Sequence, residues 1–156
     1  MDTGLLFPET IELHTRLENF FGYKIEQIKM SDLIRSWAVE HERDVPPVGT
    51  KTLESVETMQ NLGDEIRKRD PAGVARLCLA AIAEKRAERT GKTFTRGEVV
   101  EPDQEKRAYL IDSIRHPAET SLFRRAYGNA FALVGVVCRE DTLGQAHDVV
   151  AEPVAA

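Results

Sequence analysis

Apolar residues recur three and four positions apart in four segments of the chain, the spacing of one face of an α-helix. The clearest case runs from Leu53 to Ile66. Gly63 inside this segment costs about 1 kcal/mol relative to alanine, which predicts a close approach of another part of the backbone. The stretch 41–52 contains two adjacent prolines and is predicted to be a loop. The other three predicted helices cover residues 10–21, 31–37 and 70–90.

Small polar residues and glycines mark the expected ends of these helices. Ser31 or Asp32 is expected to cap the second helix, because side-chain oxygens there accept hydrogen bonds from the free N–H groups of the first turn. Asp70, followed by Pro71, is expected to play the same part for the fourth helix. Gly91 is expected to end that helix, and the polar stretch 92–106 is predicted to be a surface loop.

The stretch from 107 to 137 changes from an apolar run to a helical pattern and back, which predicts strand, helix, strand. Pro117 suits the first position of the helix, Glu119 its first turn, and Gly128 a left-handed cap. The near-continuous apolar run 131–137 is typical of a strand covered on both faces, as in parallel sheets. With a further short strand over residues 24–30, the pattern predicts an α/β fold with at least three parallel strands.

Polar residues follow the strand predicted at 108–111, at the edge where parallel sheets bind their ligands. Arg115 can donate two hydrogen bonds to a phosphate, or it is a surface arginine beside a helix. Asp112 can hold a metal-bound water, or it caps the turn. Ser113 lies between them. These residue types therefore indicate a phosphate or nucleotide site at this edge.

Composition narrows the function classes. The 156 residues carry a net charge of −5, which argues against a general nucleic-acid binder, since such proteins need a basic surface. The two cysteines, Cys78 and Cys138, lie far apart without metal-binding spacing and are interpreted as buried free thiols. No stretch of about 18 apolar residues is present. We therefore expect a cytoplasmic protein that does not associate with membranes.

Three segments resemble the N-terminal domain of the anti-phage deoxycytidylate deaminases, which join a P-loop kinase-like domain to a zinc-dependent deaminase domain. The main one is the strand–I-D-S-I-R-H-P-x-E–helix–Y-G pattern between Ile111 and Gly128. The second is F-G-Y at residues 21–23, followed by Ile28 and M-S-D-L-I at 30–34. The third is M-Q-N-L-G-D-E-I-R at residues 59–67. Together they cover roughly residues 10–138.

This resemblance implies a partial P-loop NTPase, a nucleotide-kinase-like three-layer sandwich with parallel strands, in which the first strand and the phosphate loop are missing. Residues 1–9 are expected to be an irregular N-terminus, 10–138 the incomplete kinase-like domain and 139–156 a disordered tail. Gly91-Lys92-Thr93 matches the end of a P-loop, but it follows a predicted helix, whereas a phosphate loop follows a strand. In nucleotide-kinase-like folds the helix that carries Arg67 faces the acceptor nucleotide, although Arg67 can also be one of several solvated charges.

The function implied by the resemblance is that of a regulatory domain for a deaminase. Its expected partners are the deaminase domain, a nucleotide or a regulatory RNA, and a second copy of the chain. Zinc is expected only in the deaminase domain, which this chain lacks, so the chain alone should not deaminate. One alternative is a stand-alone nucleoside monophosphate kinase or dephospho-coenzyme A kinase relative. Another is a non-catalytic nucleotide- or RNA-binding module that uses the basic helix faces of Lys85, Arg86 and Arg89 or of Arg124 and Arg125.

Overall fold

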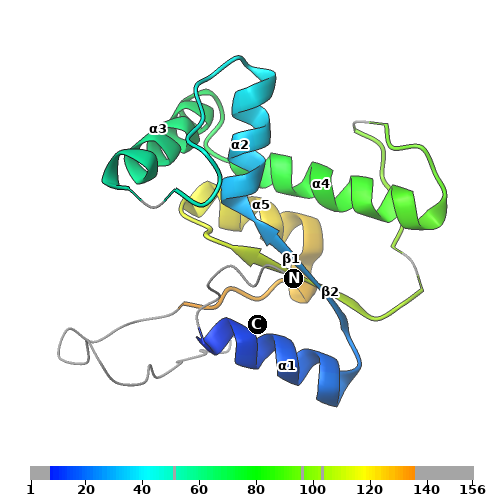
Figure 1. Ribbon diagram of the computed structural model, residues 1–156. Coiled ribbons are helices and arrows are strands. Elements are labelled where there is room, and N and C mark those ends of the chain that lie inside the picture. Colours follow the sequence, from blue (N-terminus) through cyan, green and yellow to red (C-terminus); the bar gives the residue numbers. More distant parts are fainter. Residues whose placement is uncertain (1–7, 51, 96, 103, 136–156) are drawn as a thin grey trace.

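The computed structural model describes residues 8–50, 52–95, 97–102 and 104–135, and in them it shows a mixed α/β arrangement (Figure 1). Two strands lie among five α-helices and one short 3-10 helix. In chain order the elements are α1 (Pro8–Phe21), β1 (Lys24–Lys29), α2 (Met30–Glu40), α3 (Leu53–Arg69), α4 (Gly73–Thr90), β2 (Arg107–Asp112), α5 (Pro117–Tyr127) and η1 (Gly128–Ala130).

The two strands pair in parallel, in a register that runs from Lys24 opposite Arg107 to Lys29 opposite Asp112. In Figure 1, α1 lies on one side of the pair, while α4 and α5 lie on the other. The described residues therefore place helices on both sides of a parallel sheet, as the predicted α/β class requires. Both strands end at the same edge, close to the start of α5.

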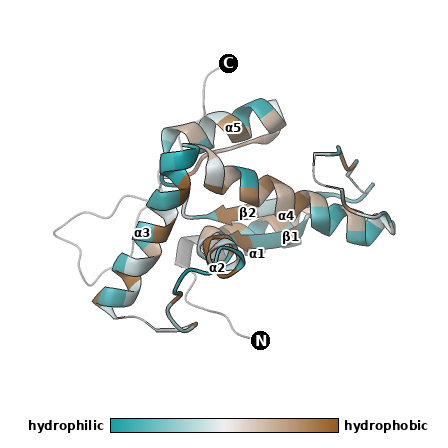
Figure 2. Ribbon diagram, turned by 90° about the horizontal axis from the view of Figure 1, so that it is seen from above, coloured by the Kyte–Doolittle hydropathy of each residue, from teal (hydrophilic) through white to brown (hydrophobic). Residues whose placement is uncertain are grey.

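The core lies between the strands and helices α2 to α5. Side chains alternate between the two faces of a strand, so Ile28 and Ile111, which are opposite each other, share one face. Ile28 belongs to one buried core cluster with the fully buried Phe123 of α5 and Val74 of α4, and Ile111 packs against this cluster. Helix α3 carries alternating bands of hydrophilic and hydrophobic residues along its length (Figure 2). Its apolar side contributes Leu62 and Ile66 to the same core.

The predicted helices all form, with differences at their ends. Helix α1 begins at Pro8 rather than at residue 10, and α2 begins at Met30, where neither Ser31 nor Asp32 serves as the cap. The prediction that Asp70 caps the start of α4 was wrong. Asp70 follows the end of α3, and its carboxylate accepts a hydrogen bond of 3.0 Å from the backbone N–H of Ala72 in the turn between the two helices.

That turn is tight because Gly73 starts α4 directly against α3. A Cβ atom at Gly73 would lie 2.7 Å from the side chain of Ile66, so only glycine fits without a shift. At the other end of α4, Gly91 has the predicted left-handed conformation, with φ of 64°. Gly128 after α5 also has a positive φ, of 54°, but its ψ of −127° lies outside the left-handed helical region.

The strand predicted at 131–137 was wrong for the residues that the structure describes. Phe131–Gly135 has no regular secondary structure, and 136 and 137 lie outside the described residues. Phe131 is held by the core, where its ring stacks on Phe123 at 5.6 Å, but Leu133 and Val134 are 45% and 46% exposed. An apolar run forms a strand only when its backbone pairs with a neighbouring strand. Among the described residues β1 and β2 pair only with each other, so this part of the chain has two parallel strands rather than the three or more that were expected. The predicted tail at 139–156 also lies outside the described residues.

Candidate functional site

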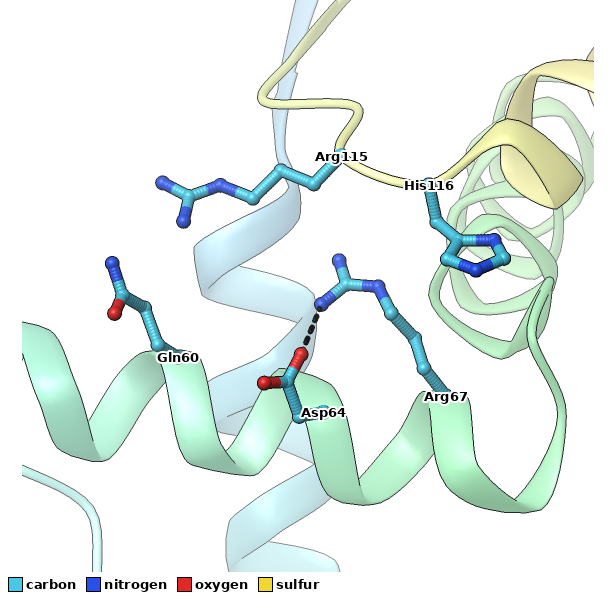
Figure 3. Close-up of a pocket in the computed structure, with 5 residues that line it drawn as sticks. All are labelled: Gln60, Asp64, Arg67, Arg115 and His116. Atoms are coloured by element: carbon cyan, nitrogen blue, oxygen red, sulfur yellow. Dashed lines mark hydrogen bonds and ion pairs between the residues drawn. The ribbon is translucent and has the colours of Figure 1, made fainter.

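An open pocket of about 210 Å³ lies where the connection from β2 to α5 passes over α3. Two of its lining residues, Arg115 and His116, come from that connection, and three come from α3 (Figure 3). The α3 residues are Gln60, Asp64 and Arg67, which are four and three positions apart and therefore share one side of the helix. The pocket thus joins two segments that are distant in the sequence.

Glu119 lies behind the pocket and organises it. Its side chain is fully buried, and it accepts three hydrogen bonds. Oε1 accepts one of 2.9 Å from Nε of Arg67. Oε2 accepts two from the backbone, of 3.0 Å from the N–H of Arg115 and 3.2 Å from the N–H of His116. Glu119 therefore satisfies free N–H groups at the start of α5 and at the same time fixes the arginine of α3.

His116 completes the start of α5. Its Nδ1 accepts a hydrogen bond of 3.1 Å from the backbone N–H of Ala118, which with Glu119 makes a reciprocal capping arrangement. A ring nitrogen that accepts from an N–H carries no proton, so the proton of a neutral His116 is on Nε2. The ring therefore carries its hydrogen-bond donor on Nε2.

Arg67 is held on two sides and lies close to the backbone of its own helix. Its side chain is 14% exposed, and Nη1 lies 3.4 Å from Oδ1 of Asp64. A Cβ atom at Gly63 would lie 2.9 Å from this Nη1 and 3.3 Å from the side chain of Ile34. The close approach predicted at Gly63 is present, but side chains make it rather than another stretch of backbone.

Arg115 differs from Arg67 because its guanidinium is exposed and makes no ion pair or hydrogen bond with the described residues. Its backbone N–H is fixed by Glu119. In Figure 3 the side chain extends over α3 toward Gln60, opposite the guanidinium of Arg67. Because the backbone of Arg115 is fixed and its guanidinium is unpaired among the described residues, the side chain is well suited to bind an anion that enters from solvent.

Of the four residues proposed from the sequence, the structure brings Arg67 and Arg115 to one pocket. Asp112 and Ser113 do not line it. Both are exposed, and the Ser113 hydroxyl donates to Asp112 at 2.9 Å. Ser113 also has a φ of 73°, which is unusual for a residue with a side chain. The pair therefore makes a local turn at the end of β2.

The sequence interpretation missed the roles of Gln60, Asp64, His116 and Glu119. Two signals were present. Gln60 and Asp64 share a helix face with Arg67, and the separation of three between His116 and Glu119 is that of a capping box. Neither spacing indicates which charged residues from the two segments will meet.

A second group of charged side chains surrounds Glu26 on β1. Its carboxylate pairs with Arg89, with Arg107 at 3.2 Å and with Lys85 at 3.8 Å. This pairing raises the pKa of Arg89, chiefly through the hydrogen bond to Glu26. Lys85 and Arg89 therefore contribute to the contact between α4 and β1, in addition to the basic helix face that was expected.

The same side of α4 carries a guanidinium packed on aromatic rings. The guanidinium carbon of Arg86 lies 5.7 Å from the ring centre of Tyr109 and 5.9 Å from that of Tyr127. Arg86 is half-buried, so the expectation of an exposed arginine was wrong at this position.

Cys78 is fully buried on α4, as predicted, and burial raises its pKa to about 12. Cys138 lies outside the described residues.

Within the part of the chain that the structure describes, no group of three or more histidine, cysteine, aspartate or glutamate side chains is arranged to hold a metal ion. None of the described helices is both long and apolar enough to cross a membrane.

Comparisons with protein-family models, with curated proteins and with solved structures give no match to this chain.

Proposed function

We propose that the pocket between α3 and the start of α5 binds the phosphate group of a nucleotide. The observation that carries this proposal is the difference between its two arginines. Arg67 is fixed by Glu119 at 2.9 Å, whereas the guanidinium of Arg115 is exposed and unpaired among the described residues. An unpaired guanidinium in the same pocket as a fixed one provides planar hydrogen-bond donors from two directions. This arrangement suits the several oxygens of a phosphate group.

The pocket residues divide the work of binding as follows. Arg115 donates to two phosphate oxygens, since its planar group matches the spacing of those oxygens. Nη2 of Arg67 makes no hydrogen bond with a described residue and supplies a further donor. His116 lines the same pocket. Glu119 does not contact the ligand in this scheme; it holds Arg67 and the backbone at Arg115 in place.

We further propose that this binding domain regulates a deoxycytidylate deaminase, and that the zinc site belongs to the deaminase domain. The support is the sequence resemblance between Ile111 and Gly128, together with the site geometry at that same segment. Glu119 connects the segment to α3 through Arg67. A ligand that engages both arginines would therefore restrict movement of α3 relative to α5, and such a restriction can be transmitted to an attached domain.

Calorimetric titration of the purified chain with deoxycytidine monophosphate and with inorganic phosphate tests the proposal. We expect binding that Arg115→Ala weakens about tenfold or more, because a hydrogen bond to a charged group contributes about 1.5–3 kcal/mol. Lys68→Ala is the control, since it removes the same charge from an exposed position next to Arg67, outside the pocket. Absence of binding, or equal weakening by both variants, would contradict a specific site at the pocket.

A further inference from the structure

The pocket contains one carboxylate among its donors. Asp64 lines the pocket with its side chain 65% exposed, and Figure 3 shows it between Gln60 and Arg67, with its carboxylate turned toward Arg67. Its ion pair with Nη1 of Arg67 is long, at 3.4 Å. The carboxylate is therefore only weakly bound and can interact with a ligand.

The formal charges of the four ionised groups around the pocket cancel before any ligand enters. Arg67 and Arg115 are positive, whereas Asp64 and the buried Glu119 are negative. Of these two cations, Arg115 is the one without a counter-ion among the described residues, so it can pair with a single phosphate group. A second or third phosphate would bring more negative charge next to Asp64, and the described residues offer no other unpaired cation in the pocket to neutralise it. Like charges placed close together repel.

The same carboxylate favours a particular kind of neighbour for the phosphate. An ionised aspartate only accepts hydrogen bonds, so Asp64 can bind a hydroxyl or amino group of the ligand. Asp64 therefore repels additional anionic groups and binds a hydrogen-bond donor. Repulsion of one ligand and attraction of another are the two ways in which a site distinguishes similar ligands.

We propose that Asp64 determines the ligand class of this pocket. It selects a phosphate monoester that carries a hydroxyl or amino group near the phosphate, over pyrophosphate and nucleoside triphosphates. This inference rests on the proposed binding of a phosphate group by Arg115 and Arg67.

Calorimetry with four probes tests the selection: inorganic phosphate, pyrophosphate, deoxycytidine monophosphate and deoxycytidine triphosphate. The unmodified chain should bind the monophosphate more tightly than the triphosphate. Asp64→Asn keeps the shape of the side chain but removes its charge, so it should strengthen triphosphate and pyrophosphate binding about tenfold relative to the monophosphate. Glu57→Gln removes the same charge from an exposed position on α3 outside the pocket, and it should leave the ratios unchanged.

The outcomes separate this inference from the proposed function. If the chain binds phosphate through Arg115 but Asp64→Asn changes mono- and triphosphate affinity equally, the role of Asp64 is refuted and the binding function stands. A preference of the unmodified chain for the triphosphate also refutes it. If none of the probes binds, or if binding is insensitive to Arg115→Ala, the proposed function fails and the selection by Asp64 fails with it.

Discussion

Glu119 and Glu26 both pair with arginine, but their carboxylates have different further partners: backbone N–H groups at Glu119 and other cationic side chains at Glu26. Glu119 is fully buried, and two of its three hydrogen bonds come from backbone N–H groups. Glu26 is 14% exposed, and its ion pairs all come from side chains, on α4 and β2. Backbone donors do not move independently of the fold, whereas long cationic side chains can change rotamer and be solvated by water.

The difference has a consequence for the arginines nearby. Around Glu26 the cations are engaged within the protein, and Arg107 also pairs with Glu105 at 2.8 Å. At Glu119 the backbone occupies one carboxylate oxygen, so a single guanidinium is bound and Arg115 remains exposed without a partner among the described residues. A buried acid that binds backbone amides leaves a neighbouring cation available for a ligand.

The largest effect expected from this comparison is that of Glu119→Gln on stability. The substitution leaves Arg67 without its buried counter-ion and turns an amide group toward backbone N–H groups or toward the guanidinium. Breaking a buried pair by removing one partner costs about 3–5 kcal/mol. Urea unfolding followed by circular dichroism measures the loss, with the exposed Glu57→Gln as control. A loss below about 1 kcal/mol would show that Glu119 does not hold the two segments together.

The rate at which Cys78 is labelled gives a second measure of the stability lost in Glu119→Gln. The thiolate is the reactive form, and burial raises the pKa of this thiol to about 12. In a Cys138→Ser background, Cys78 is the sole cysteine and should react very slowly at pH 8. Glu119→Gln should accelerate labelling about a hundredfold or more, in proportion to the larger unfolded fraction. Equal rates in the two proteins would mean that the region around Cys78 opens independently of Glu119.

The effect of Glu26→Gln should be smaller, about 1–2 kcal/mol. The carboxylate is close to the surface, so Arg89 and Lys85 can gain water when it is neutralised, and pairs of this kind lie between the buried and the exposed cases. The same urea experiment measures it. A loss as large as that of Glu119→Gln would remove the distinction between backbone and side-chain partners.

Salt should produce the smallest effect and should act on one region only. At 1 M NaCl the screening length is about 3 Å, which weakens partly exposed pairs far more than buried ones. The stability difference between the unmodified chain and Glu26→Gln should therefore fall by about half, whereas the difference for Glu119→Gln should persist. A parallel decrease in both would indicate that water reaches Glu119.

Local signals in the sequence predicted local structure well. Pro117, Glu119 and Gly91 marked helix ends, and the cost of a glycine within α3 indicated the tight packing at Gly63. The pairing of Arg67 with Glu119 joins residues 52 positions apart, so no pattern within either segment indicated it. The sequence placed Glu119 in the first turn of a helix without showing that it would be buried.

The predictions from the sequence were wrong where the structure of a segment depends on contacts with segments distant in the chain. Phe131–Gly135 is apolar enough for a strand, but strand formation requires pairing with a neighbouring strand, and neither β1 nor β2 pairs with this segment. Asp112 and Ser113 lie at the ligand-binding edge that the strand rule indicates. The rule does not state which side chains at that edge face a pocket, and the positive φ at Ser113 has no signal in its residue type.

The pairing of β1 with β2 also constrains the order in which the chain folds. Opposed residues such as Lys24 and Arg107 are separated by more than half of the chain, so closing the sheet costs more chain entropy than joining α3 to α4 through their short turn. Contacts of such long range form late and slow folding. Pulsed hydrogen exchange during refolding should therefore detect protected amides in α3 and α4 before those of β1. On a ribosome, β1 emerges long before its partner strand exists.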